Sequence, residues 1–269
     1  MIRINKIKTM FMKDFDDIIK TKYIAASLIA LPILMIIIVP LSFLLPMMLD
    51  PTGFQSGDMA FLSNFPLTSN WSSLDEFQQS FVFFVEIANI FYVMIPFILP
   101  TIIAADSFSG EKDRGTVEAL VAAPITDSEL YIGKVASAVI PTVGMTWLFC
   151  IPQIFMINVF SIKVLGYYYL PNLQYLIIVV LLTPAVTLLM TNVMIWASTR
   201  TNTARDSQQM GSLIALPLMF LVINFSTLAL VISETILLVG VVIVYFMAYG
   251  SYIVGLDLLD RERWLSYTK

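Results

Sequence analysis

Long apolar stretches dominate this sequence of 269 residues and decide the solvent in which it can fold. Each is long enough to cross a lipid bilayer, which takes roughly 20 apolar residues. Only 13% of the residues are charged, against about 25% in a typical soluble domain, so the chain cannot cover itself with polar surface. We therefore predict an all-α polytopic membrane protein with six spans, at residues 24–49, 80–105, 135–160, 173–198, 211–232 and 235–256.

Prolines interrupt many of these apolar stretches. In a soluble helix a proline removes a hydrogen bond and breaks or kinks the helix. In a membrane bundle, neighbouring helices satisfy the carbonyl groups that a proline leaves free. We therefore expect kinked spans rather than breaks at Pro32, Pro40, Pro46, Pro96, Pro100, Pro141, Pro152, Pro184 and Pro217.

The distribution of basic residues orients the predicted spans. Fourteen of the 15 basic residues fall in the N-terminal segment, the second-to-third connection, the fourth-to-fifth connection and the tail; only Lys163 falls on the other side. Because positive residues stay in the cytoplasm, we predict a multi-pass plasma-membrane protein with both termini cytoplasmic. The net charge of −4 argues against nucleic-acid binding, which usually needs a basic face. The domains are then a cytoplasmic helix at 1–23, a six-span transmembrane domain at 24–256 and a cytoplasmic tail at 257–269.

Apolar residues recur at helical spacing in the N-terminal segment, while lysines lie elsewhere around the helix. This pattern is typical of an amphipathic helix in the cytoplasmic membrane interface, with its lysines toward anionic headgroups. A cytoplasmic extension of the first span is the alternative. The apolar set consists of Ile4, Ile7, Phe11, Phe15 and Ile18.

The connection between the second and third stretches has strong signals for a short helix. Gly115 permits a turn, and Thr116 can cap a helix that begins at Val117. Glu118 in the first turn of that helix complements the helix dipole. Pro124 ends the helix after about two turns.

A second helix is predicted to start at Thr126, in the same connection. Thr126 and Glu129 have the spacing of a capping box, and Ile125 with Leu130 has that of a hydrophobic staple. Two short, well-defined helices would make a rigid cytoplasmic protrusion. A solvated loop that only joins two spans remains the alternative.

The run EKDRGTVEALVAAPITDSELYIGK, from Glu111 to Lys134, resembles the signature of type-2 ATP-binding-cassette (ABC) permeases. The resemblance implies a coupling helix between spans two and three that docks on a separate ATPase subunit. It places Glu111 and Arg114 where polar contacts with the ATPase are expected. The residues that it implies for this contact are Glu111, Arg114, Gly115, Thr116, Glu118, Leu120 and Pro124.

The same resemblance implies the permease subunit of an ATP-driven transporter, an exporter by expectation, which pairs with a second permease chain. ATP and magnesium are expected in the partner ATPase, because the nearest approach to a phosphate loop, Gly110 to Thr116, has no lysine after its second glycine. An ATP-independent carrier or channel is the alternative. A membrane-embedded enzyme would need a polar catalytic cluster; the sequence has no histidine and one cysteine, Cys150, so neither a Cys/His metal site nor a Ser/His/Asp triad can form.

Glu86 is the one acidic residue well inside an apolar stretch. An intramembrane carboxylate is a functional candidate, so Glu86 and nearby Asn89 are candidates for a substrate path. The alternatives are a wet membrane surface for Glu86 and a helix-to-helix hydrogen bond for Asn89. Tyr167, Tyr168 and Tyr169 are expected to anchor at a membrane interface. The connection at 199–210 either touches the same partner as the 111–134 run or is solvated.

Overall fold

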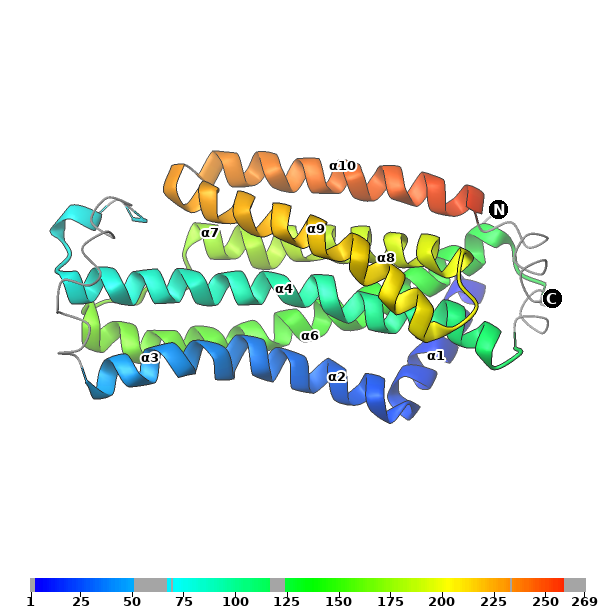
Figure 1. Cartoon of the computed structure of the whole chain (residues 1–269), viewed down its shortest axis with the longest axis horizontal. Helices are drawn as coiled ribbons and strands as arrows, with labels where there is room; N and C mark the ends of the chain where they lie inside the picture. The colour runs from blue at the N-terminus through cyan, green and yellow to red at the C-terminus, as the bar shows by residue number, and fades with distance from the viewer. Residues whose placement is uncertain (1–2, 51–66, 69, 117–123, 233, 259–269) are drawn as a thin grey trace.

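The long helices of the protein lie side by side along its longest axis (Figure 1). The computed structural model describes residues 3–50, 67–68, 70–116, 124–232 and 234–258, and every regular element in those ranges is helical. The predicted all-α fold with six spans is confirmed. Within the described residues, six helices are long and apolar enough to cross a membrane: Lys22–Leu49, Glu76–Asp113, Asp127–Val164, Leu173–Thr199, Ala204–Phe225 and Glu234–Leu256.

Two of the spans contain a stretch of π-helix, and each stretch ends beside a proline. The first span consists of α2 (Lys22–Pro32), η1 (Ile33–Ile38) and α3 (Val39–Leu49). The fourth consists of α7 (Leu173–Leu176), η5 (Ile177–Leu182) and α8 (Thr183–Thr199). The residues before Pro40 and Pro184 donate their N–H groups five residues back. The wider turn makes room for the proline ring, so the chain continues as a helix.

The second and third spans are 38-residue helices that extend past the apolar stretches. They are α4 (Glu76–Asp113) and α6 (Asp127–Val164). The predicted capping box of α6 is confirmed, since the Glu129 N–H donates to Thr126 Oγ1 at 3.3 Å and the Thr126 N–H to Glu129 Oε2 at 3.0 Å. The helix that begins there is not a short separate one, because it continues unbroken into the third span.

The fourth span and α4 form the centre of the bundle. In the most apolar 18-residue segment of each span, 67% of the residues are buried in the fourth span and 61% in α4, against 28% or less in the other four spans. The last two spans, α9 (Ala204–Ile232) and α10 (Glu234–Leu258), form an antiparallel pair (Figure 1). A short 3-10 turn, η4 (Trp71–Ser73), precedes α4.

The first helix, α1 (Ile4–Lys20), crosses one end of the bundle and packs on α6, at the same end where the α8–α9 connection lies (Figure 1). We call this end the α1 end. The buried residues of α1 are Met10, Asp14 and Ile18. At 100° per residue, this face is rotated by roughly 60° from the apolar stripe seen in the sequence, which buries a carboxylate and leaves Ile4 78% exposed. A position of α1 in the membrane interface remains a prediction. The exposed apolar side chains of α1, such as Ile4, could contact lipid there.

Gly133 on α6 sets how closely α1 approaches the bundle. A Cβ atom added there would lie 2.9 Å from Met10 Cβ and Cγ. We predict that Gly133→Ala lowers the free energy of unfolding by roughly 1–3 kcal/mol, because the packed neighbour must shift. Gly144→Ala on the same helix is the matched control, since nothing lies within 4 Å of its Cβ position. Equal thermal unfolding of the two variants in detergent micelles would contradict this account.

Candidate functional site

A fully buried lysine lies at the centre of the α1 end. Lys134 on α6 has no exposed surface, and its Nζ lies 3.0 Å from Glu111 Oε2 and 3.5 Å from Asp14 Oδ2. Its Nζ also donates to the carbonyl oxygen of Ser107 and lies 4.9 Å from the centre of the Phe108 ring. Because removing an ammonium group from water is costly, these contacts are what allows the lysine to be buried.

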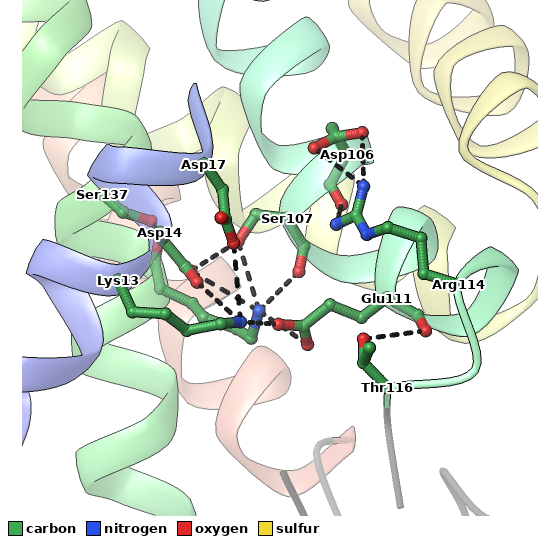
Figure 2. A network of polar contacts seen from close by, with 10 residues as sticks. Lys13, Asp14, Asp17, Asp106, Ser107, Glu111, Arg114, Thr116 and Ser137 are labelled. Carbon is green, nitrogen blue, oxygen red and sulfur yellow. Dashed lines mark hydrogen bonds and ion pairs between the residues drawn. The ribbon is translucent and has the colours of Figure 1, made fainter. Parts of the chain in front are cut away.

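The two carboxylates around Lys134 are almost as deeply buried. Asp14 is 4% exposed and accepts hydrogen bonds from Ser107 Oγ at 2.8 Å and Ser137 Oγ at 3.3 Å. Glu111 is 2% exposed and also accepts a hydrogen bond from Lys13 (Figure 2). Two lysines therefore balance two buried carboxylates. We call Lys13, Asp14, Glu111 and Lys134 the charge cluster.

Lys13 connects the charge cluster to the surface. Burial lowers the pKa of Lys13, but the hydrogen bond and charge of Glu111, together with Asp14, outweigh burial and raise the pKa above its ordinary value. The side chain is therefore protonated at neutral pH. Its Nζ also lies 3.9 Å from Asp17 Oδ2, which is exposed on α1.

The charge cluster joins three helices that are far apart in the sequence. Lys13 and Asp14 come from α1, Glu111 from the last turn of α4, and Lys134 from the first turns of α6. The 114–126 connection leaves α4 and enters α6 directly beyond this cluster. Sequence reasoning missed Asp14, although its spacing of four residues from both Met10 and Ile18 placed it on the buried face.

The start of the connection is a tight helix stop. Gly115 has a φ of +67°, and its N–H donates to the Lys112 carbonyl at 3.0 Å. The Thr116 N–H donates to the Glu111 carbonyl at 3.0 Å, which completes a Schellman motif. The Arg114 side chain turns back along α4, with Nη1 3.2 Å from Asp106 Oδ1 (Figure 2).

The end of the connection is held by the beginning of α1. Arg3 donates its backbone N–H to Glu129 Oε1 at 2.8 Å, and its Nε lies 3.2 Å from the same oxygen. The Pro124 carbonyl accepts hydrogen bonds from Arg3 Nη2 at 3.4 Å and from Lys6 Nζ. Both ends of the connection are therefore fastened to the bundle, and α1 contributes to both.

The structure places the predicted ATPase contacts in two different settings. Glu111 is buried in the charge cluster, whereas Arg114, Gly115 and Thr116 lie exposed at the start of the connection and Pro124 lies exposed at its end. Glu118 and Leu120, with the short helix predicted from Val117, lie outside the described residues. Contact of any of these seven residues with an ATPase stays a prediction.

The predicted substrate-path residues lie in the other half of the bundle. Glu86 is 3% exposed and accepts hydrogen bonds from Tyr169 Oη at 2.6 Å and Asn89 Nδ2 at 3.0 Å. The Asn158 Oδ1 accepts the backbone N–H groups of Tyr169 and Leu170, at 3.1 Å and 3.0 Å. Glu86 thus lies inside the protein and fastens the α6–α7 connection to α4, and Tyr169 is buried rather than placed at a membrane surface. A role in substrate passage stays a prediction.

Four apolar helices around a central apolar pair, with a fastened connection at one end, define a helical multi-pass membrane protein in the described residues. A family model described as ABC-2 family transporter protein matches residues 9–243. The chain therefore belongs to this family and is a membrane permease subunit of an ABC transporter, as the 111–134 run indicated. A search of curated proteins gave no match, and neither did a search of solved structures.

The charge cluster is testable through its central lysine. We predict that Lys134→Met lowers the free energy of unfolding by about 3–5 kcal/mol, because it leaves two buried carboxylates without their shared counter-charge. Lys163→Met is the matched control, since Lys163 is exposed on the same helix. Thermal unfolding in detergent measures both. An additional Glu111→Gln substitution should recover part of the loss, and an unchanged Lys134→Met variant would contradict the role of the cluster.

Proposed function

We propose that this permease subunit is driven by a separate ATPase that docks on the 114–126 connection, and that it exports its substrate. The observation that carries the proposal is the fastening of this connection. Its start is held by a Schellman motif above the charge cluster, and its end by Arg3 and Lys6 of α1. A connection held in this way passes on a push from a partner instead of absorbing it.

The helices that carry the connection suit the transmission of a movement. Both α4 and α6 are unbroken over 38 residues. At 1.5 Å per residue each is roughly 57 Å long, which exceeds the roughly 30 Å hydrocarbon core of a bilayer. A displacement at the connection is therefore carried by rigid elements through the membrane.

The charge distribution supports a cytoplasmic position for the α1 end. Basic residues of α1, of the end of α4 and of the α8–α9 connection gather there, while Lys163 lies at the opposite end of α6. Positive residues favour the cytoplasmic side, and ATP is available there. We therefore propose that both termini are cytoplasmic and that the protein resides in the plasma membrane.

The complete transporter that we propose has two permease chains and two ATPase subunits. ATP and magnesium bind to the ATPase subunits, and this chain hydrolyses no ATP itself. Closure of the ATPase pair moves the connections of both permeases, and the spans rearrange between two access states. Family membership supports the ATPase partner in general.

Gly115 allows a test of docking. We predict that Gly115→Val lowers the amount of ATPase that co-purifies in mild detergent by about tenfold, because a β-branched residue at φ +67° costs roughly 1–2 kcal/mol and reshapes the start of the connection. Gly166→Val is the matched control: Gly166 has φ +80°, nothing lies within 4 Å of its Cβ position, and it lies at the opposite end.

Two outcomes would contradict the proposed function. Recovery of no ATPase with the wild-type chain would favour an ATP-independent carrier or channel. Equal recovery with Gly115→Val and Gly166→Val would show that the ATPase docks elsewhere on the permease.

A further inference from the structure

Three successive charged residues end α4, and they reach two different parts of the bundle. Successive residues on an α-helix point about 100° apart. Glu111 points to α1 and α6 in the charge cluster. Lys112 and Asp113 point instead to the junction between α8 and α9.

Lys112 caps the end of α8. Its Nζ donates to the Ser198 carbonyl at 2.7 Å and to the Thr201 carbonyl at 3.0 Å. The last four carbonyl groups of a helix have no partner within that helix, and a positive charge there complements the helix dipole. A residue of α4 therefore performs the role that a C-terminal capping residue of α8 would otherwise have.

Asp113 caps the beginning of α9. Its Oδ2 accepts the backbone N–H of Ala204 at 2.9 Å, and Ala204 is the first residue of α9. The first N–H groups of a helix also lack partners, and a carboxylate beside them is stabilising. The side chains of Lys112 and Asp113 thus each bind backbone groups at the α8–α9 junction, where Thr203 Oγ1 also accepts the Asp206 N–H at 3.1 Å.

A buried hydroxyl contact fastens the same junction from the interior. Ser109 on α4 and Ser207 on α9 have no exposed surface, and their hydroxyl groups are hydrogen-bonded to each other. The Ser207 hydroxyl is also hydrogen-bonded to Thr201 in the junction. Residues 109–113 at the end of α4 therefore hold the junction by two caps and one buried contact.

We propose that Lys112 and Asp113 are positioning residues that make the α8–α9 junction move together with the start of the 114–126 connection. This inference rests on the proposed function, because the docked ATPase supplies the movement. A push on the connection then acts on the fourth and fifth spans directly, in addition to the second and third spans to which the connection is covalently joined.

The test measures a distance inside the permease while the ATPase changes state. The full chain, with Cys150→Ser, carries spin labels at Thr116→Cys and Arg205→Cys, which are both exposed positions, and is assembled with its ATPase in lipid nanodiscs. In this parent the mean label distance should stay within about 2 Å between the nucleotide-free and the ATP–vanadate-trapped states. In Lys112→Ala/Asp113→Ala it should change by about 5 Å, the rise of one helical turn, or its distribution should at least double in width.

Two further variants separate positioning from general damage. Asp206→Asn removes a carboxylate from the first turn of α9. In the described residues no hydrogen bond or ion pair joins the Asp206 side chain to α4, so this variant should behave as the parent. Asp113→Asn keeps an accepting oxygen and should also stay within about 2 Å, whereas Asp113→Ala should not. Recovery of the ATPase with each variant confirms assembly.

Three results would overturn the inference. The first is a change of about 5 Å in the label distance of the parent itself. The second is a label distance in Lys112→Ala/Asp113→Ala that stays as constant as in the parent. The third is a label distance that changes as much in Asp113→Asn as in Asp113→Ala. Each can occur while the ATPase still binds to the 114–126 connection, so each leaves the proposed function standing. If the wild-type chain assembles with no ATPase, the proposed function fails, and this inference fails with it.

Discussion

The burial of the Lys134 ammonium group is the constraint on which the rest of the α1 end depends. A charge with no exposed surface needs close partners, and it has them in Glu111, Asp14 and the Ser107 carbonyl. These partners can approach only if α1 lies across α4 and α6 at one rotation. Buried ion pairs contribute little net stability compared with well-packed apolar residues, and the best-attested use of such groups is to fix register. The charge cluster thus explains the placement of α1.

The central helix α4 is held at two levels by buried carboxylates with opposite kinds of partner. Near the α1 end, Glu111 faces two lysines and joins α4 to α1 and α6. In the other half, Glu86 faces neutral donors, Tyr169 and Asn89, and joins α4 to the α6–α7 connection. The charged arrangement lies where a partner is proposed to push, and the neutral one lies deeper in the apolar bundle, where an ion pair would be harder to accommodate.

Much of the fold could be predicted because hydropathy and charge act through the solvent. The six spans, the all-helical class and the capping box of Thr126 and Glu129 depend on neighbouring residues or on composition. The lengths of α4 and α6 could not be predicted from hydropathy, since both helices continue through charged segments that tertiary contacts stabilise. Asp14 was missed for the same reason: a carboxylate in an amphipathic helix normally faces water, and only the position of Lys134 on another helix makes burial favourable.

By itself, the sequence determined the membrane location of this protein, its number of spans, the position of its principal connection and, through the 111–134 run, its family. These properties follow from apolar length, from the one-sided distribution of basic residues and from a contiguous motif. Only the tertiary structure decided what the motif residues do within the chain. It placed Glu111 in a buried charge cluster and set Lys112 and Asp113 as caps on two other helices. Such roles depend on which helix ends lie beside α4, and that is a property of packing between segments nearly 100 residues apart.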